Sequence, residues 1–265
     1  MPRRDLLSRR PLLLGVVHLP PLPGAPGHRA GSRWRQRAVT DGQAYAEAGF
    51  DGVLVENFGD APFFAGRVPP ETSAALAVAA RAVRDALPPA VTVGVNVLRN
   101  DGRAAIAIAA AAGLDFIRVN VLAGAVVTDQ GIVEGEAADL LRDRARLTPE
   151  LKILADVRVK HAAPLAPRPL DEEALDLLER AGADALILTG SRTGRGVDRE
   201  ELALLRESLP EAFLLVGSGA SRHTVRGLLA DADGAIVGSA VKRGGRTDAA
   251  VDRRRAAAFV HAARG

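Results

Sequence analysis

The stretch FLLVGSG at residues 213–219, followed by AIVGS at residues 235–239, decides the fold of this 265-residue chain. Each is a short apolar run that ends in a glycine turn, and helix-like sequence comes soon after, as expected for buried parallel strands that lead into helices. In a (β/α)8 barrel the loops after the last two strands often bind phosphate, and glycine lets backbone N–H groups approach an anion. The two turns therefore favour a barrel with an anion site, although tight turns also need glycine for purely structural reasons.

The remainder of the chain repeats this alternation of strand and helix. Apolar runs are separated by segments in which Ala, Leu, Arg and Glu recur at helical spacing. Strict alternation predicts a parallel sheet, and eight units in a chain of this length predict a closed (β/α)8 TIM barrel. We expect strands at 12–18, 52–56, 91–97, 115–121, 151–159, 184–189, 213–217 and 234–237, and helices at 36–48, 72–87, 103–112, 134–146, 171–181, 199–209, 224–230 and 249–263.

Three of the expected helices end in the pattern Ala-Gly-x-Asp, at residues 48–51, 112–115 and 181–184. Glycine in the left-handed conformation is a common helix C-cap, so the pattern supports repeated strand–helix units. We expect residues 1–10 to form a tail with solvated arginines and residues 11–265 to form a single TIM-barrel domain.

The composition excludes several classes of protein. Cysteine is absent, which rules out disulfides and cysteine metal sites, and nothing suggests an oxidising compartment. The net charge is only +3 and aromatic residues make up 3% of the chain, which does not favour a nucleic-acid partner. The apolar run near the N-terminus is short and soon meets prolines, so it is a better first strand than a signal peptide. We therefore expect a cytoplasmic protein.

Side chains along a strand alternate between the two faces of the sheet. Several expected strands end in a polar residue that is in phase with the apolar residues of the inner face. Buried charges are costly unless they are paired, so this many polar groups at a barrel mouth predict a polar ligand. Structural alternatives remain open: Arg118 and Glu56 could form an ion pair, the two asparagines could cap loops, and His18 could simply pack beside the prolines. The residues concerned are His18, Glu56, Asn96, Arg118, Asn120, Asp156, Arg158, Lys160 and Thr189.

Lys160 is the most informative of these residues because only three of the chain's 35 basic residues are lysines. Unlike arginine, a desolvated lysine can lose its proton and act as a base or Schiff-base nucleophile. It could equally bind a phosphate or a carboxylate. Asp156, in the same phase, is either its ion-pair partner or a separate general base. We expect Asp156, Lys160 and Glu56 to be catalytic.

The loop after the sixth strand and the two glycine turns are the expected phosphate ligands. The loop can present backbone N–H groups and hydroxyls to an anion, although it could also be a plain turn. No close ligand spacing supports a metal site built from His18, Glu56 and Asp156, so we expect neither metal nor cofactor. The expected phosphate-binding residues are Gly190, Ser191, Gly217, Ser218, Gly219, Gly238 and Ser239.

Two long loops, at 19–35 and 57–71, follow strands and therefore lie on the catalytic face of the barrel. The second loop carries Phe58, Phe63 and Phe64. Apolar side chains of this size need a surface to cover. We expect them to pack under a lid or into a homo-oligomer interface.

Five motifs give the chain a family resemblance: VHLPPLPGAP at 17–26, VENFGDAPF at 55–63, GVNVLRND at 94–101, FIRVNV at 116–121 and LADVRVKHA at 154–162. Together with the glycine turns, over residues 11–262, they resemble the BtpA/SgcQ family. The resemblance implies a TIM barrel related to the ribulose-phosphate-binding barrels. The family is named after a protein implicated in photosystem I assembly or stability, and a related branch is associated with sugar or nucleoside enzymes.

Two functions follow as hypotheses. The first is an enzyme acting on a small phosphorylated metabolite, a sugar phosphate or nucleotide-like compound, by isomerisation, aldol-type cleavage or N-glycosidic cleavage. The second is a non-catalytic assembly factor that associates peripherally with a membrane complex. The residues expected to bind substrate are His18, Asn57, Asn96, Arg118, Asn120, His161 and Thr189.

Overall fold

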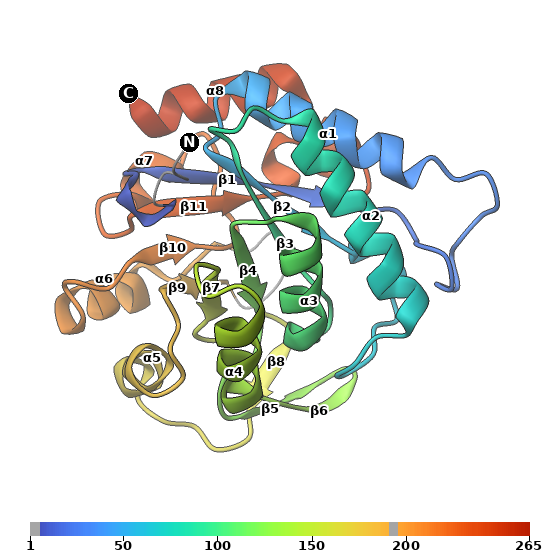
Figure 1. The fold of residues 1–265 in the computed structure, drawn as a ribbon. Coiled ribbons are helices and arrows are strands. Elements are labelled where there is room, and N and C mark those ends of the chain that lie inside the picture. Colours follow the sequence, from blue (N-terminus) through green and yellow to red (C-terminus); the bar gives the residue numbers. More distant parts are fainter. Residues whose placement is uncertain (1–5, 191–195) are drawn as a thin grey trace.

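Eight parallel strands close into a barrel (Figure 1). This computed structural model describes residues 6–190 and 196–265. The barrel strands follow one another in chain order, and the first pairs with the last, which confirms the predicted TIM barrel. The strands are β1 (Leu12–His18), β2 (Gly52–Glu56), β3 (Thr92–Asn96), β4 (Phe116–Val119), β7 (Lys152–Asp156), β9 (Ala185–Leu188), β10 (Leu214–Val216) and β11 (Gly234–Val237).

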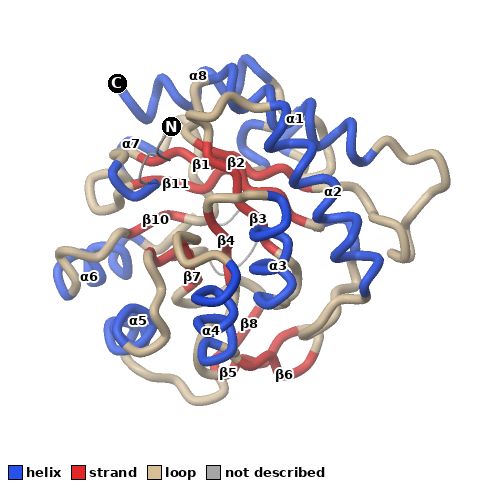
Figure 2. The backbone as a smooth tube through the Cα atoms, viewed as in Figure 1, coloured by secondary structure: helices blue, strands red, loops and turns tan. Residues whose placement is uncertain are grey.

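Helices cover the outside of the barrel, as Figure 2 shows in blue around the red strands. Within residues 6–190 and 196–265, every helix is too short or too polar to cross a membrane. Four short 3-10 helices, Leu6–Ser8, Phe58–Asp60, Ser239–Val241 and Arg243–Gly245, supplement them in the same ranges. The α-helices are α1 (Trp34–Ala48), α2 (Pro70–Ala86), α3 (Gly102–Ala112), α4 (Ala137–Leu147), α5 (Leu170–Glu179), α6 (Arg199–Ser208), α7 (Val225–Leu228) and α8 (Arg253–Arg264).

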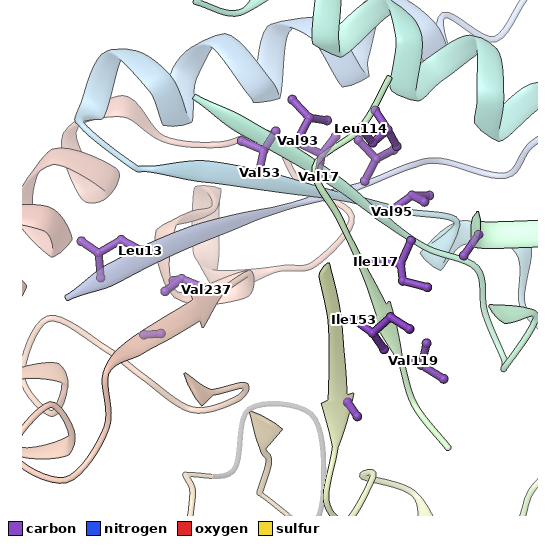
Figure 3. Close-up of a cluster of buried hydrophobic side chains, with 14 of the residues drawn as sticks. Leu13, Val17, Val53, Val93, Val95, Leu114, Ile117, Val119, Ile153 and Val237 are labelled. Atoms are coloured by element: carbon purple, nitrogen blue, oxygen red, sulfur yellow. The ribbon is translucent and has the colours of Figure 1, made fainter. Parts of the chain in front are cut away.

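The alternation of side chains along the strands divides the core into two groups. Outward-facing residues such as Val53, Val93 and Ile153 pack in the layer beneath the helices (Figure 3). Residues of the opposite phase, from Leu14 on β1 to Leu154 on β7, form a separate cluster that fills the barrel. The polar residues at the strand ends share this second phase, so they lie on the inner face of the barrel, above the apolar cluster.

Four aspartates at the base of the barrel explain the repeated Ala-Gly-x-Asp pattern and extend it to Asp233. Each carboxylate accepts a hydrogen bond of 2.8 or 2.9 Å from a backbone N–H of the neighbouring strand. Each also forms an ion pair with an arginine from a surrounding helix, so the same residue ties strand to strand and strand to helix. The pairs are Asp51–Arg264, Asp115–Arg84, Asp184–Arg144 and Asp233–Arg206.

The described part of the expected tail packs against this base. Leu6 is buried and belongs to the cluster inside the barrel. Arg9 donates to the carbonyl of Ala90 and pairs with Asp51, and Arg10 pairs with Asp233. Arg9 is thus largely covered by the barrel, whereas the side chain of Arg10 remains 57% exposed, as expected for a solvated arginine.

A small antiparallel sheet of three strands, β5 (Ala125–Thr128), β6 (Gly131–Glu134) and β8 (Ala162–Pro164), lies beside the barrel mouth and was not predicted. Its inner face packs Val126 and Val133 into a cluster with Val121 and Val159. Because β6 extends to Glu134, α4 starts three residues later than expected. On the outer face, Val127 and Ile132 are cross-strand partners and remain 44% and 57% exposed.

Candidate active site

The polar residues that end β1, β2 and β3 lie side by side. His18 is level with Glu56 in the strand register, and Glu56 is level with Asn96. The Oε2 atom of Glu56 accepts a hydrogen bond of 2.9 Å from the Nδ2 of Asn96. Its Oε1 atom lies 3.8 Å from the Nε2 of His18. Glu56 and Asn96 are buried, so this carboxylate is held in place by its neighbours.

His18 is a neutral histidine in this setting. Burial lowers its pKa well below the ordinary value, and the positive charges of Lys242 and Lys160 lower it further. The ring packs against Phe58, with centroids 4.7 Å apart. A hydrogen bond with the backbone of Thr247 opposes this shift in part, and the Nδ1 atom of the ring is buried.

Arg118 on β4 and Asp156 on β7 form a buried ion pair. The Nη2 of Arg118 lies 2.9 Å from the Oδ1 of Asp156. Asn120 donates from its Nδ2 to the Oδ2 of the same carboxylate over 2.6 Å. The expected alternatives, Arg118 with Glu56 and Asp156 with Lys160, are therefore replaced by an Arg118–Asp156 pair. The Oδ1 of Asn120 is left buried and without a partner among the described residues.

Lys160 follows β7 and lies where two cavities of the mouth meet. It lines both of them together with Glu56, Phe58 and Arg118. Burial lowers the pKa of its ammonium group, and Arg118 lowers it further, while Glu56 and Asp156 oppose the shift. A lysine whose charged form is disfavoured in this way more readily supplies a neutral amine.

The smaller cavity, of about 220 Å³, brings the two glycine turns together. Gly217, Ser218 and Gly219 line it from one turn, and Gly238 and Ser239 from the other. Gly219 has a φ of 71°, in the left-handed region that favours glycine. A Cβ on Gly238 would approach the Cε1 of His18 to 2.8 Å. Small residues are thus needed where the turns approach the mouth.

The larger cavity, of about 690 Å³, extends from Lys160 away from the glycine turns. It also includes Phe63, so Phe58 and Phe63 both face the site, whereas Phe64 is 55% exposed. The other residues that line it are Leu98, Arg99, Asn120, Asp129, His161 and Ala162.

Several predicted site residues lie outside the linings of these two cavities. Asn57 instead braces its own loop: its Oδ1 accepts from the Leu98 N–H and its Nδ2 donates to Asp60. Thr189 donates its hydroxyl to the carbonyl of Arg158 over 2.8 Å. Asn96 and Asp156 are also absent from both linings and contact the site through Glu56 and Arg118.

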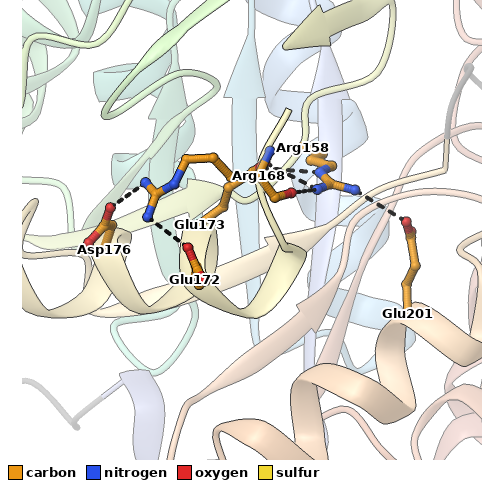
Figure 4. Close-up of polar contacts among 6 residues, drawn as sticks. All are labelled: Arg158, Arg168, Glu172, Glu173, Asp176 and Glu201. Carbon is orange, nitrogen blue, oxygen red and sulfur yellow. Dashed lines mark hydrogen bonds and ion pairs between the residues drawn. The ribbon is translucent and has the colours of Figure 1, made fainter. Parts of the chain in front are cut away.

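Arg158 was expected at the mouth, but β7 ends at Asp156. Beyond the end of the strand, side chains no longer alternate between the two faces, so the strand phase does not place Arg158 on the inner face. Its guanidinium forms ion pairs with Glu173 on α5 and Glu201 on α6 instead (Figure 4). Gly190 is buried next to Thr189 and lines neither cavity. Ser191 lies outside the described residues.

Two cations near the site were missed in the sequence. Lys242 has no exposed surface and donates from its Nζ to the carbonyl of Thr247, a residue of the smaller cavity. The scarcity of lysine that drew attention to Lys160 applies equally to Lys242. Arg99 is also buried and lines the larger cavity, but it lies in a loop after β3, where strand phase carries no information.

Solved structures with the same fold include the native KDPGal structure, with a TM-score of 0.61 and 18% identity, covering 95% of this chain and 94% of that one. N-(5'-phosphoribosyl)anthranilate isomerase from Pyrococcus furiosus has a TM-score of 0.59 and 14% identity, covering 95% and 98% of the two chains. At these identities the likeness concerns the fold alone.

Sequence relatives are much more similar. An uncharacterized protein of Pyrococcus abyssi is 46% identical over 242 residues, which cover 91% of each chain. The photosystem I biogenesis protein BtpA of Synechocystis is 41% identical over 257 residues, which cover 94% of this chain and 87% of that protein. The BtpA family model matches residues 9–265. This chain therefore belongs to the BtpA family.

Proposed function

We propose that the protein is an enzyme that binds a small phosphorylated metabolite, a sugar phosphate or nucleotide-like compound, in the joined cavities. The observation that carries the proposal is that the 217–219 and 238–239 turns line one cavity with His18, Glu56 and Lys160. The phosphate would lie against the two turns, where backbone N–H groups and the hydroxyls of Ser218 and Ser239 can donate to it. The isomerase of the same fold from Pyrococcus furiosus, which is named after a phosphoribosyl compound, agrees with this ligand class.

Lys160 and Glu56 are the groups best placed to act on the bound substrate. Both line both cavities, so a ligand that spans the mouth passes between them. A neutral Lys160 can take a proton from a carbon next to a carbonyl, or attack the carbonyl itself. Either role fits an isomerase or an aldol-type lyase, and Glu56 as an acid also fits N-glycosidic cleavage. Asp156 accepts hydrogen bonds from Arg118 and Asn120 and holds those two side chains in place.

A thermal-shift screen against a panel of phosphorylated metabolites tests this proposal, because a ligand that binds only the folded state raises the melting temperature. Inorganic phosphate soaked into crystals should bind at the two turns, with N–H···O distances of about 2.7–3.2 Å. If no phosphorylated compound stabilises the protein, and phosphate binds only elsewhere, the proposal is wrong.

The assembly-factor hypothesis has its own support. The Synechocystis relative is named a photosystem I biogenesis protein, and the outer face of the β5-β6-β8 sheet exposes Val127 and Ile132. In that case, loss of this apolar face would abolish association while substitutions at Lys160 would be silent. The homo-oligomeric state and cytoplasmic location expected from the sequence remain predictions.

A further inference from the structure

Arg99 is a buried cation that the proposed phosphate site does not use. It is only 6% exposed and lines the larger cavity, on the side of Lys160 away from the glycine turns. Its Nη2 donates to the carbonyl of Lys160 over 2.6 Å. Among the described residues, no carboxylate lies within ion-pair distance of its guanidinium.

Arg99 differs from Arg118 in having no carboxylate partner among the described residues. Both arginines are buried in the same mouth, but Arg118 has Asp156 as a partner at 2.9 Å. Removing an arginine from water costs several kcal/mol unless an anion compensates. Burial accordingly lowers the pKa of Arg99, and the charges of Asp156, Asp129 and Glu56 only partly oppose this. A guanidinium presents a planar fork that matches a carboxylate or phosphate.

Asn120 adds an independent sign of a ligand in the same cavity. Its Nδ2 is committed to Asp156, and its Oδ1 is buried without a donor among the described residues. Buried acceptors in proteins are usually satisfied, so a hydroxyl group of a ligand is the natural partner.

We propose that Arg99 binds a second anionic group of the substrate, a carboxylate or a second phosphate, so that the substrate is a polyhydroxylated phosphate with negative charge at both ends. One end lies at the glycine turns and the other at Arg99, with Lys160 between them. This inference rests on the proposed function, because it assumes that the first phosphate lies at the turns.

Calorimetric titration of matched linear compounds tests it. Sorbitol 6-phosphate carries one anionic end, whereas 6-phosphogluconate and sorbitol 1,6-bisphosphate carry two. Erythritol 4-phosphate and 4-phosphoerythronate form a shorter pair. We expect at least one doubly anionic compound to bind tenfold or more tightly than its singly anionic partner, and the favoured compound identifies the second group as carboxylate or phosphate.

Arg99→Met should remove that preference and leave the affinity for the singly anionic compound within twofold. Arg99→Lys, which keeps the charge but loses the fork, provides a second variant and should retain part of the preference. Arg142→Met, on the outside of α4, is the control and should change nothing. Equal binding of both members of each pair, or a preference that survives in both Arg99 variants, overturns the inference. Failure of all five compounds to bind overturns the inference, whereas the proposed function is tested separately, by the metabolite screen and the phosphate soak at the two turns.

Discussion

Lys160 lies at the junction of the two cavities, and its chemistry can be separated from its charge by Lys160→Arg. The variant keeps a cation but cannot readily lose a proton. Turnover of the substrate found by screening should fall about 100-fold or more, the usual contribution of a positioned acid–base group. The melting temperature should hardly change, because Asp156 already has Arg118 as its partner. Lys152→Arg, at an ion pair with Asp184 on the barrel base, is the matched control. Retained turnover in Lys160→Arg would leave this lysine as a ligand only.

Arg118 should be the residue on which stability of the mouth depends most. Arg118→Met leaves Asp156 buried without its cation, which typically costs about 3–5 kcal/mol. Urea denaturation measures the loss. The control is Arg103→Met, whose ion pair with Asp143 is partly exposed and should contribute about 1 kcal/mol or less. Replacing both partners, as Arg118→Met/Asp156→Leu, should recover much of the stability. Equal losses in Arg118→Met and Arg103→Met would show that the pair is unimportant.

Lys242 should make stability depend on pH. Burial lowers its pKa from the ordinary 10.5 to about 8 in the folded protein. Between these values the unfolded chain binds more protons than the folded one, so the free energy of unfolding rises as the pH increases from about 8 to about 10.5. The contribution is at most about 3 kcal/mol, since one pKa unit corresponds to about 1.4 kcal/mol.

Lys242→Met should remove this contribution. Lys160 and Tyr45 also titrate differently in the folded and unfolded states, but both are present in the variant. The difference in unfolding free energy between the two proteins therefore isolates Lys242, and a difference that does not vary from pH 8 to 10.5 would contradict the prediction.

At the scale of elements, the turn after β11 depends on close contact between Gly238 and His18. Gly238→Ala introduces a Cβ 2.8 Å from the Cε1 of the His18 ring. We expect a cost of about 1–3 kcal/mol from overpacking and an affinity for phosphorylated ligands reduced about tenfold. Gly66→Ala is the control, because nothing lies within 4 Å of the added Cβ. Unchanged ligand affinity in Gly238→Ala would argue against a phosphate at this turn.

At the scale of the whole molecule, the outer face of the β5-β6-β8 sheet is the surface best suited to association. Light scattering of Val127→Ser/Ile132→Ser should show a lower mass than the wild type, with ligand binding unchanged. Phe63→Ser should leave the mass unchanged and weaken ligand binding, since Phe63 lines the larger cavity. Leu204→Ser, an exposed apolar residue on α6, is the control. If the wild type is already monomeric, this surface does not join copies of the chain.

The barrel and much of its mouth could be predicted from the sequence because their signals are local. Strand–helix alternation and the glycine caps depend on neighbouring residues, and the strands at 12–18, 52–56 and 234–237 were predicted with their observed bounds. Strand phase likewise placed His18, Glu56 and Arg118 on the inner face. The phase argument failed at Arg158, where β7 had already ended at Asp156.

Only the tertiary structure decided which groups meet. Asp156 pairs with Arg118, 38 residues away, and not with the nearby Lys160, because adjacent barrel strands bring these side chains together. Arg99 and Lys242 reach the site from loops and turns, where no periodicity predicts direction. The small sheet depends on pairing between β5 and the distant β8. Sequence periodicity thus determined the scaffold, because each residue's phase is a local property, whereas the charge pairing was decided by packing between segments far apart in the chain.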